Sequence, residues 1–231
     1  MKKFILFLLL IHFSSNFTYS QGFRFGIKGG GNFTFLTNTD LKFKDVKPLP
    51  GYIVGVMGIY DLSIVSLQGE VLYTSNKFNT IEEKNSNTVL TTYNLDVSNG
   101  KISIPVTLNL GIGPFIFGIG PQLDKLVSSK AVGTISNLAS GNTTITDVAF
   151  DYINDTSGIG AYKDFATKPE NMFNDLGISA NLSFGYNFGN VRADIKLNYS
   201  LTDAINDFYL KNSSSQSEKT VIGSLTLAYI F

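Results

Sequence analysis

Cysteine and tryptophan are absent from this chain of 231 residues, and its single histidine is His12. His12 lies in an N-terminal segment that we expect to be removed, which leaves a chain with neither His nor Cys. These absences exclude Ser-His-Asp and Cys-His catalysis, zinc sites of the usual ligand set, haem ligation by His or Cys, and disulfide bonds. No grouping of Asp, Glu or Ser has a diagnostic spacing, so the sequence predicts no enzyme, no metal site and no cofactor.

Charge and long hydrophobic runs are also scarce. Charged residues make up 16% of the chain, against about 25% in a typical soluble domain. The 18 basic and 18 acidic residues balance, so we expect no binding to nucleic acid. After residue 20 no apolar run approaches the roughly 18 residues of a membrane-spanning helix.

The N-terminus has the features of a secretion signal. Lys2 and Lys3 precede an apolar run over residues 4–13, and a small-residue cleavage site follows at residues 18–20. We therefore interpret residues 1–20 as a cleaved signal peptide and residues 21–231 as one domain. An N-terminal membrane anchor is the alternative, but the run is too short to span about 30 Å of hydrocarbon as a helix.

The remaining apolar residues follow a period of two. Residues 191–202 alternate without a fault between apolar side chains and polar ones. Residues 176–188 alternate in the same way, and Gly189-Asn190 between the two segments is a typical two-residue hairpin turn. Weaker alternation predicts six further strands, at residues 23–35, 52–60, 64–76, 102–109, 112–123 and 221–231.

Short and long connections between these strands alternate strictly. The connections at 61–63, at Gly111 and at Gly189-Asn190 are short, whereas the others are long and polar: 36–50, 77–100, 124–171 and 203–217. Outer-membrane barrels have this asymmetry, with short periplasmic turns and long extracellular loops. We predict an all-β fold, an eight-stranded antiparallel transmembrane β-barrel integral to the outer membrane, with both termini in the periplasm. A soluble lipocalin-like barrel with its apolar residues inward is the alternative, because alternation alone does not tell inside from outside.

The last predicted strand carries a large apolar side chain at every second position and ends on aromatic residues. The row consists of Leu225, Leu227, Tyr229 and Phe231. It resembles the C-terminal signal that the barrel-assembly machinery recognises, and we expect that machinery to insert the protein.

The polar face of the predicted strands carries charged and amide side chains that would meet inside the barrel. They are Arg24, Lys28, Gln68, Glu70, Arg192, Asp194 and Lys196. This set is either a plug of salt bridges or the lining of an anion-selective pore. We favour the plug, because side chains just fill the interior of an eight-stranded barrel and because buried charges must pair.

Several segments carry short motifs beyond the alternation. Residues 102–108 followed by 111–123 contain an "x-I-P-L-x-L-K … G-P-Y"-like core, and residues 175–207 form a late hairpin with Ser200 where Gly is usual. Together with the opening FGIKGGGNFT at 25–34, these segments resemble the PorT-like outer-membrane barrel proteins of the Bacteroidetes type. The resemblance covers nearly all of residues 21–231 and implies the barrel fold. The namesake assists type IX protein secretion, a role that fold-level similarity does not transfer.

The sequence thus predicts a small outer-membrane barrel with a plugged polar lumen. We expect it to act structurally or through its surface loops, 124–171 foremost, in envelope interactions, since loops of that length are usually functional or disordered. A narrow channel or porin for small solutes is the alternative. The expected partners are outer-membrane lipid and lipopolysaccharide, the barrel-assembly machinery during biogenesis, and an envelope protein complex.

Overall fold

The structure is a computed structural model that describes residues 22–37, 43–86, 89–139, 142–151, 175–202 and 219–231. These residues form nine strands. Their bounds are β1 Phe23–Thr37, β2 Phe43–Leu62, β3 Val65–Ser86, β4 Val89–Ile112, β5 Phe115–Ala139, β6 Asn142–Asp151, β7 Leu176–Phe188, β8 Val191–Ser200 and β9 Lys219–Ile230.

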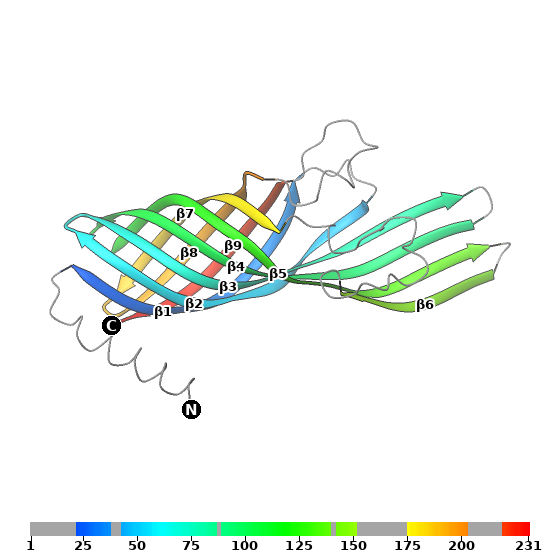
Figure 1. The fold of residues 1–231 in the computed structure, drawn as a ribbon, viewed down its shortest axis with the longest axis horizontal. Coiled ribbons are helices and arrows are strands. Elements are labelled where there is room, and N and C mark those ends of the chain that lie inside the picture. Colours follow the sequence, from blue (N-terminus) through cyan, green and yellow to red (C-terminus); the bar gives the residue numbers. More distant parts are fainter. Residues whose placement is uncertain (1–21, 38–42, 87–88, 140–141, 152–174, 203–218) are drawn as a thin grey trace, which may run out of the picture.

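Eight of the nine strands close into a ring (Figure 1). The hydrogen-bonded order is β4-β3-β2-β1-β9-β8-β7-β5, and β4 pairs with β5 to complete the circle. Every pairing in the ring is antiparallel. The prediction of an eight-stranded antiparallel barrel is therefore confirmed. The ninth strand, β6, pairs with β5 outside the ring and was not expected from the sequence.

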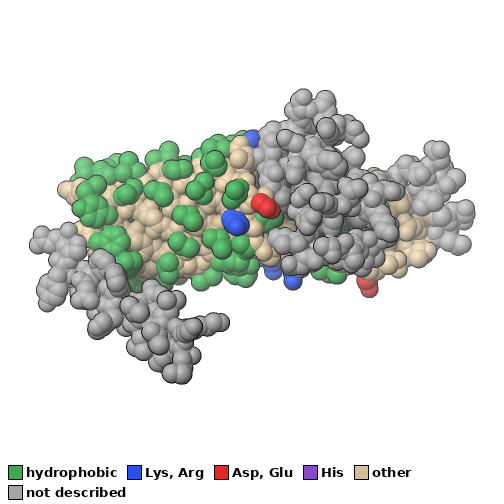
Figure 2. Space-filling view, in the orientation of Figure 1, with side chains coloured by type: hydrophobic (Ala, Val, Ile, Leu, Met, Phe, Trp, Pro, Cys, Tyr) green, Lys and Arg blue, Asp and Glu red, His purple; other side chains and the backbone are tan. Residues whose placement is uncertain are grey.

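The wall of the ring is apolar outside and polar inside, as β8 illustrates. Ile195 and Leu197 are 56% and 50% exposed, whereas the side chains that alternate with them, Arg192, Asp194 and Lys196, are at most 4% exposed. Exposed apolar side chains continue over the barrel half of the molecule in Figure 2. Such a wall fits a hydrocarbon medium. The lipocalin-like alternative, which requires apolar side chains inward, is wrong.

Three two-residue turns lie at one end of the ring, which we call the turn end. They are Ser63-Ile64, Gly113-Pro114 and Gly189-Asn190. Their first residues have φ angles of 76°, 60° and 68°, a left-handed backbone that tight hairpin turns require and that glycine adopts without strain. The third turn lies where the alternation predicts it. The other two come later than the predicted positions 61–63 and 111, because the flanking strands are longer.

At the opposite end four strands continue past the ring and form a five-stranded sheet with β6, which we call the extension (Figure 1). It consists of residues 43–49 of β2, 75–86 of β3, 89–100 of β4, 128–139 of β5 and all of β6. β3, β4 and β5 contain 22, 24 and 25 residues, about twice the 9–11 that a strand needs to cross a bilayer.

The extension corrects the predicted connections. Most of residues 36–50 and 77–100 lies in strands rather than in loops. Within the predicted loop 124–171, residues 124–139 and 142–151 also lie in strands. The alternation continues in these segments, but most of the outward side chains are now polar. Because a membrane-spanning strand is expected to have an apolar outer face, the sequence of these segments resembles that of polar loops.

The reversal is clear in β4. Leu95 and Val97 point inward and are buried, while Asp96 between them is exposed. Nearer the turn end the same inward parity carries polar side chains, Thr107 and Asn109, both at most 2% exposed. A polar outer face requires water as its medium, so the reversal marks the limit of the apolar wall.

A β-bulge in β5 accompanies this reversal. The register of β5 against β4 shifts by one residue beside Gly100, which leaves Val127 as an extra residue. Before the bulge the even-numbered side chains of β5 are buried, and after it odd-numbered ones such as Ala131 and Ile135 are. Bulges re-aim the side chains that follow them, and this one keeps apolar residues on the inner face of the extension.

Some predicted segments lie outside the described residues. These are the signal peptide at 1–20, the connection at 203–217 and residues 152–171 of the loop predicted at 124–171. Among the residues that the structure describes, no helix is long and apolar enough to cross a membrane.

Candidate functional site in the barrel lumen

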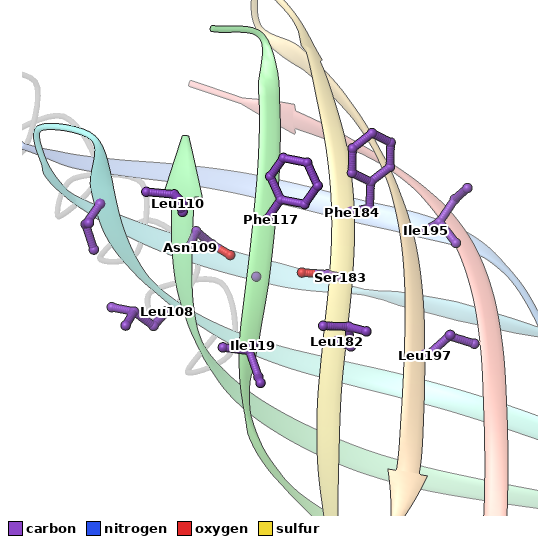
Figure 3. Close-up of a pocket in the computed structure, with 12 residues that line it drawn as sticks. Leu108, Asn109, Leu110, Phe117, Ile119, Leu182, Ser183, Phe184, Ile195 and Leu197 are labelled. Atoms are coloured by element: carbon purple, nitrogen blue, oxygen red, sulfur yellow. The ribbon is translucent and has the colours of Figure 1, made fainter. Parts of the chain in front are cut away.

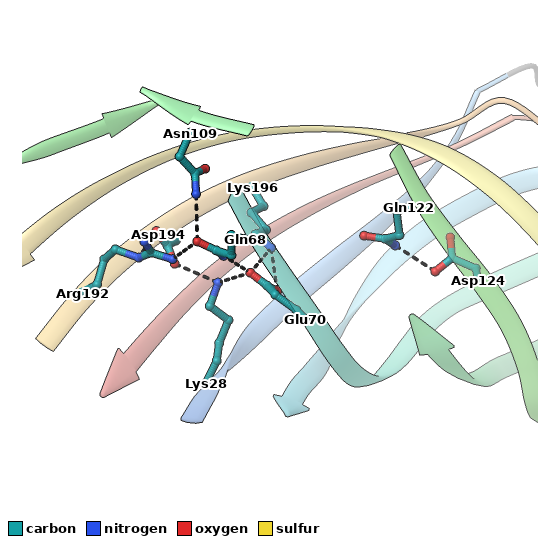
Figure 4. Close-up of polar contacts among 9 residues, drawn as sticks. All are labelled: Lys28, Gln68, Glu70, Asn109, Gln122, Asp124, Arg192, Asp194 and Lys196. Carbon is teal, nitrogen blue, oxygen red and sulfur yellow. Dashed lines mark hydrogen bonds and ion pairs between the residues drawn. The ribbon is translucent and has the colours of Figure 1, made fainter. Parts of the chain in front are cut away.

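Charged side chains from three strands meet inside the ring (Figure 4). Because residues two apart on a strand share a face, Gln68 and Glu70 of β3 both point inward, and so do the three ionised side chains of β8. β3 and β8 are four positions apart in the ring of eight, so they face one another across the lumen. Lys28 of β1 lies between them. We call this set the lumen network: Lys28, Gln68, Glu70, Arg192, Asp194 and Lys196.

Glu70 is the centre of the network. Its carboxylate oxygens lie 2.8 Å and 2.8 Å from Lys196 Nζ and 2.9 Å from Lys28 Nζ. Gln68 Nε2 donates a further hydrogen bond to Glu70 Oε1. Glu70 is 2% exposed. A buried carboxylate is stable only with such compensation, and here the compensating charges come from both sides of the lumen.

Asp194 and Gln68 complete the connection. Lys28 Nζ lies 2.9 Å from Asp194 Oδ2, so one ammonium bridges the two carboxylates. Arg192 Nε lies 3.1 Å from Asp194 Oδ1, and Arg192 Nη2 donates a hydrogen bond of 2.6 Å to Gln68 Oε1. The resulting chain of contacts runs unbroken from β8 through β1 to β3, and it ties opposite walls of the barrel together.

Arg24 is the predicted lumen residue that lies apart from the network. It faces Asp61 at the turn end, with Nε 2.7 Å from Oδ2 and Nη2 3.0 Å from Oδ1. The two side chains are 41% and 32% exposed. The structure therefore brings six of the seven predicted residues together and places the seventh in a separate, partly solvated ion pair near the rim.

Two further groups of side chains fill the lumen. One is an apolar cluster of Met57, Ile59, Ala228 and Ile230, each at most 3% exposed. It borders the network directly, since Met57 pairs with Glu70 and Ala228 pairs with Arg192 in the strand register. Apolar residues on an otherwise polar inner face interrupt the alternation expected of a lumen, so the sequence pattern did not single them out.

Towards the extension lies a second polar layer, centred on Asp124 of β5. Its carboxylate accepts hydrogen bonds from Ser103 Oγ at 2.5 Å, Gln122 Nε2 at 2.8 Å and Ser179 Oγ at 2.9 Å. Asn109 was also missed, although its amide donates a hydrogen bond of 3.0 Å to Gln68. The alternation along β4 and β5 indicates that both residues face the lumen. It does not show which of the inward side chains contact one another.

The contacts link strands that face one another across the lumen. The carboxylates of the lumen network are each held by cations, and no His or Cys is available after residue 20. Within the described ranges, no group of three or more His, Cys, Asp or Glu side chains is arranged to hold a metal ion.

The outer wall carries an apolar groove of about 570 Å³ across β4, β5, β7 and β8 (Figure 3). Most of its lining points outward, including Leu108, Ile119 and Leu182, and Gly118 forms part of the floor. The groove is thus a dent in the apolar wall and not an entrance to the lumen. The C-terminal row also points outward: Leu225, Leu227, Tyr229 and Phe231 are all exposed.

Comparisons with known proteins give one family match and distant structural neighbours. No curated protein matches the chain. Among solved structures, the attachment invasion locus protein Ail of Yersinia pestis is 11% identical, with 92% of this chain and 100% of Ail covered and a TM-score of 0.40. Neisserial surface protein A is 12% identical, with 90% and 99% covered and a TM-score of 0.44. The family model described as outer membrane protein beta-barrel domain matches residues 13–206. The chain therefore belongs to the outer membrane protein beta-barrel domain family and is an integral outer-membrane β-barrel.

Proposed function

We propose that this protein is a closed, non-enzymatic outer-membrane barrel that works through its extension. In this proposal the extension lies outside the cell, where it meets envelope or surface partners, and the turn end faces the periplasm together with the start of β1 and the end of β9. Short periplasmic turns and long extracellular segments are the rule in bacterial outer-membrane barrels. We also group the chain with the PorT-like proteins, on the segments at 25–34, 102–108, 111–123 and 175–207.

The observation that carries the proposal is the extension itself. The three longest strands exceed what a bilayer requires by about ten residues each. The excess is folded into a sheet that exposes polar side chains such as Asn94 and Asp96 beside a few apolar ones such as Val132. A barrel that only spans a membrane needs no such sheet. We attribute this sheet to selection for a folded surface above the membrane.

The lumen supports a closed state. A solute would have to separate Glu70 from Lys196 and Lys28 and also displace the apolar cluster that borders them. One observation favours the alternative of a narrow anion channel: the lumen network contains three cations and two carboxylates, which leaves one positive charge in excess.

Biogenesis and lipid contacts follow from the outer wall. We propose that the barrel-assembly machinery recognises the outward row at the end of β9, and that lipopolysaccharide and membrane lipid cover the apolar wall. An apolar band of this kind is the lipid-facing surface of transmembrane barrels.

A closed lumen predicts electrical silence. Refolded residues 21–231 in a planar bilayer are expected to show no single-channel conductance, because the network and the apolar cluster occupy the lumen. Folding is checked by heat-modifiable migration on a gel, and a porin serves as the positive control. A stable conductance that changes on Glu70→Gln or Arg192→Gln contradicts the closed barrel and establishes the anion channel in its place.

The orientation is testable with single cysteines, since the native chain has none. Thr143→Cys in the extension is expected to react with a membrane-impermeant maleimide on intact cells. Ile64→Cys at the turn end, where the native side chain is 67% exposed, is the matched control and is expected to react only after the outer membrane is permeabilised. The reverse pattern overturns the orientation and, with it, a role for the extension at the cell surface.

A further inference from the structure

Among the residues that the structure describes, β6 forms an edge of the extension. This strand pairs with β5 through ten successive residues, from Lys130↔Asp151 to Ala139↔Asn142. No strand among the described residues pairs with its other side, and the order of the sheet ends there. A strand edge of this length presents a row of backbone N–H and C=O groups that can accept another strand.

The two edges of the extension differ in their protection. At residues 43–49 the edge strand β2 carries exposed Lys47 and Pro48, with Pro50 at the point where β1 pairing begins. Lysine and proline on an edge discourage the addition of a further strand. β6 contains neither residue, and its register with β5 has no bulge. One edge is therefore blocked and the other is left available.

The side chains of β6 are accessible on both faces of the sheet. Successive residues on a strand point to opposite faces, and all of Thr143, Thr144, Ile145, Thr146 and Asp147 are exposed. Threonine and isoleucine are strand-forming residues that pair well across a ladder. An incoming strand would thus meet a regular backbone and side chains suited to cross-strand contact.

Charge decides between two occupants of this edge. The charged residues of β6 are both aspartates, of which Asp147 is an exposed example. Asp151 lies opposite Lys130 of β5 in the register, whereas Asp147 lies opposite the uncharged Thr134. Pairing β6 with the same strand of a second copy would bring a second Asp147 to this edge without adding a cation, and like charges across a ladder are destabilising. A segment that carries lysine or arginine complements the edge instead.

We propose that the free edge of β6 is a strand-addition site for an extended, basic segment of another protein. The partner contributes backbone hydrogen bonds along β6 and a cation opposite Asp147, in the manner of β-augmentation. This inference rests on the proposed function, since it names the class of partner that the extension binds.

The test uses a defined probe. A fluorescent ten-residue peptide of alternating lysine and valine is titrated into the full-length mature protein in lipid nanodiscs, and anisotropy reports binding. We expect saturable binding that is lost when alternate peptide amides are N-methylated, because methylation removes ladder donors but keeps charge and side chains. Asp147→Lys is expected to raise the dissociation constant about tenfold and to transfer preference to a glutamate-valine peptide.

The matched control is Asp96→Lys. It makes the same charge change on the exposed face of β4, a strand paired on both sides and away from the edge, so we expect it to leave binding unchanged. Equal binding of the methylated peptide, or an equal loss with Asp96→Lys, reduces the effect to general electrostatics and overturns the strand-addition site. Dimerisation of the protein through β6 without peptide also overturns it in favour of self-pairing.

The proposed function and the strand-addition site on β6 are contradicted by different results. If Thr143→Cys is labelled from outside and the barrel is silent, but no peptide binds, the strand-addition site is wrong while the proposed function stands. If Thr143→Cys is inaccessible on intact cells, the proposed function fails whatever the peptide does.

Discussion

Replacing Glu70 by glutamine is expected to lower the free energy of unfolding of the barrel by about 3–5 kcal/mol. The amide keeps the shape of the side chain but removes the charge that holds Lys28 and Lys196 in the lumen, 2.8–2.9 Å away. Lys196 then loses the carboxylate that it contacts, and Lys28 keeps only Asp194 as a counter-charge. Urea titration in phospholipid vesicles, followed by gel migration of folded and unfolded forms, measures the change.

The control for Glu70→Gln is the same chemical change in the exposed ion pair. Asp61→Asn breaks the pair with Arg24, but both side chains there are about one-third exposed or more, so water replaces the lost contact and we expect a cost of about 0–1 kcal/mol. Adding Lys196→Met to Glu70→Gln is expected to recover part of the loss, since it removes one unpaired charge. Equal costs for Glu70→Gln and Asp61→Asn would contradict a desolvated network.

The second large effect concerns the outer surface of β5. Ile119→Arg is expected to cost about 2–4 kcal/mol, the penalty for an arginine on the lipid face near the middle of a bilayer. Val132→Arg on the same strand is expected to stay within about 0.5 kcal/mol, as surface substitutions in water usually do. The native side chains are 64% and 58% exposed, so exposure alone does not separate them.

The comparison of these two variants locates the limit of the membrane along β5. The difference is measured by the same urea titration in vesicles. We expect the difference in unfolding free energy between the two variants to disappear in a short-chain detergent, whose alkyl chains form too thin an apolar belt around Ile119. If Val132→Arg costs as much as Ile119→Arg, hydrocarbon reaches the extension, and the polar outer face of that sheet has no explanation.

The hairpin of β7 and β8 was predictable to within two residues because one physical rule acts along its whole length. It stays inside the apolar wall, so large apolar side chains face outward from Leu176 to the last residues of β8. The turn at Gly189-Asn190 has glycine where φ is positive. Local pattern and turn chemistry therefore agree, and the ring of eight strands follows from repeating this logic.

The extension was not predictable in the same way because its strands cross from one medium to another. In β4 the inward row changes from Leu95 and Val97 to Thr107 and Asn109 without a change of parity. If hydrocarbon is assumed to surround the whole strand, the part of β4 that contains Leu95 and Val97 resembles a polar loop. β6 was hidden for a further reason: it is exposed on both faces, so it has no apolar stripe to reveal a strand.

The lumen network was predictable as a set but not as a set of contacts. Alternation shows which residues face inward, whereas the pairing of Glu70 with Lys196 depends on which strands lie opposite and on their stagger. Arg24 has the right parity, but its height on β1 brings it to Asp61 at the rim. The position of a residue along the barrel axis depends on the stagger of all the strands in the closed ring.

The pairing of β1 with β9 has a consequence for the timing of assembly. The ring is closed by contacts from Gly26↔Ile230 to Thr37↔Lys219, between the earliest and the latest strands of the chain. Until β9 arrives, β1 and β8 are open edges, and hydrocarbon does not tolerate unpaired backbone groups. Membrane entry therefore has to wait until β9 has been synthesised and exported, and the preceding strands must travel unfolded or chaperoned until its pairing with β1 completes the circle.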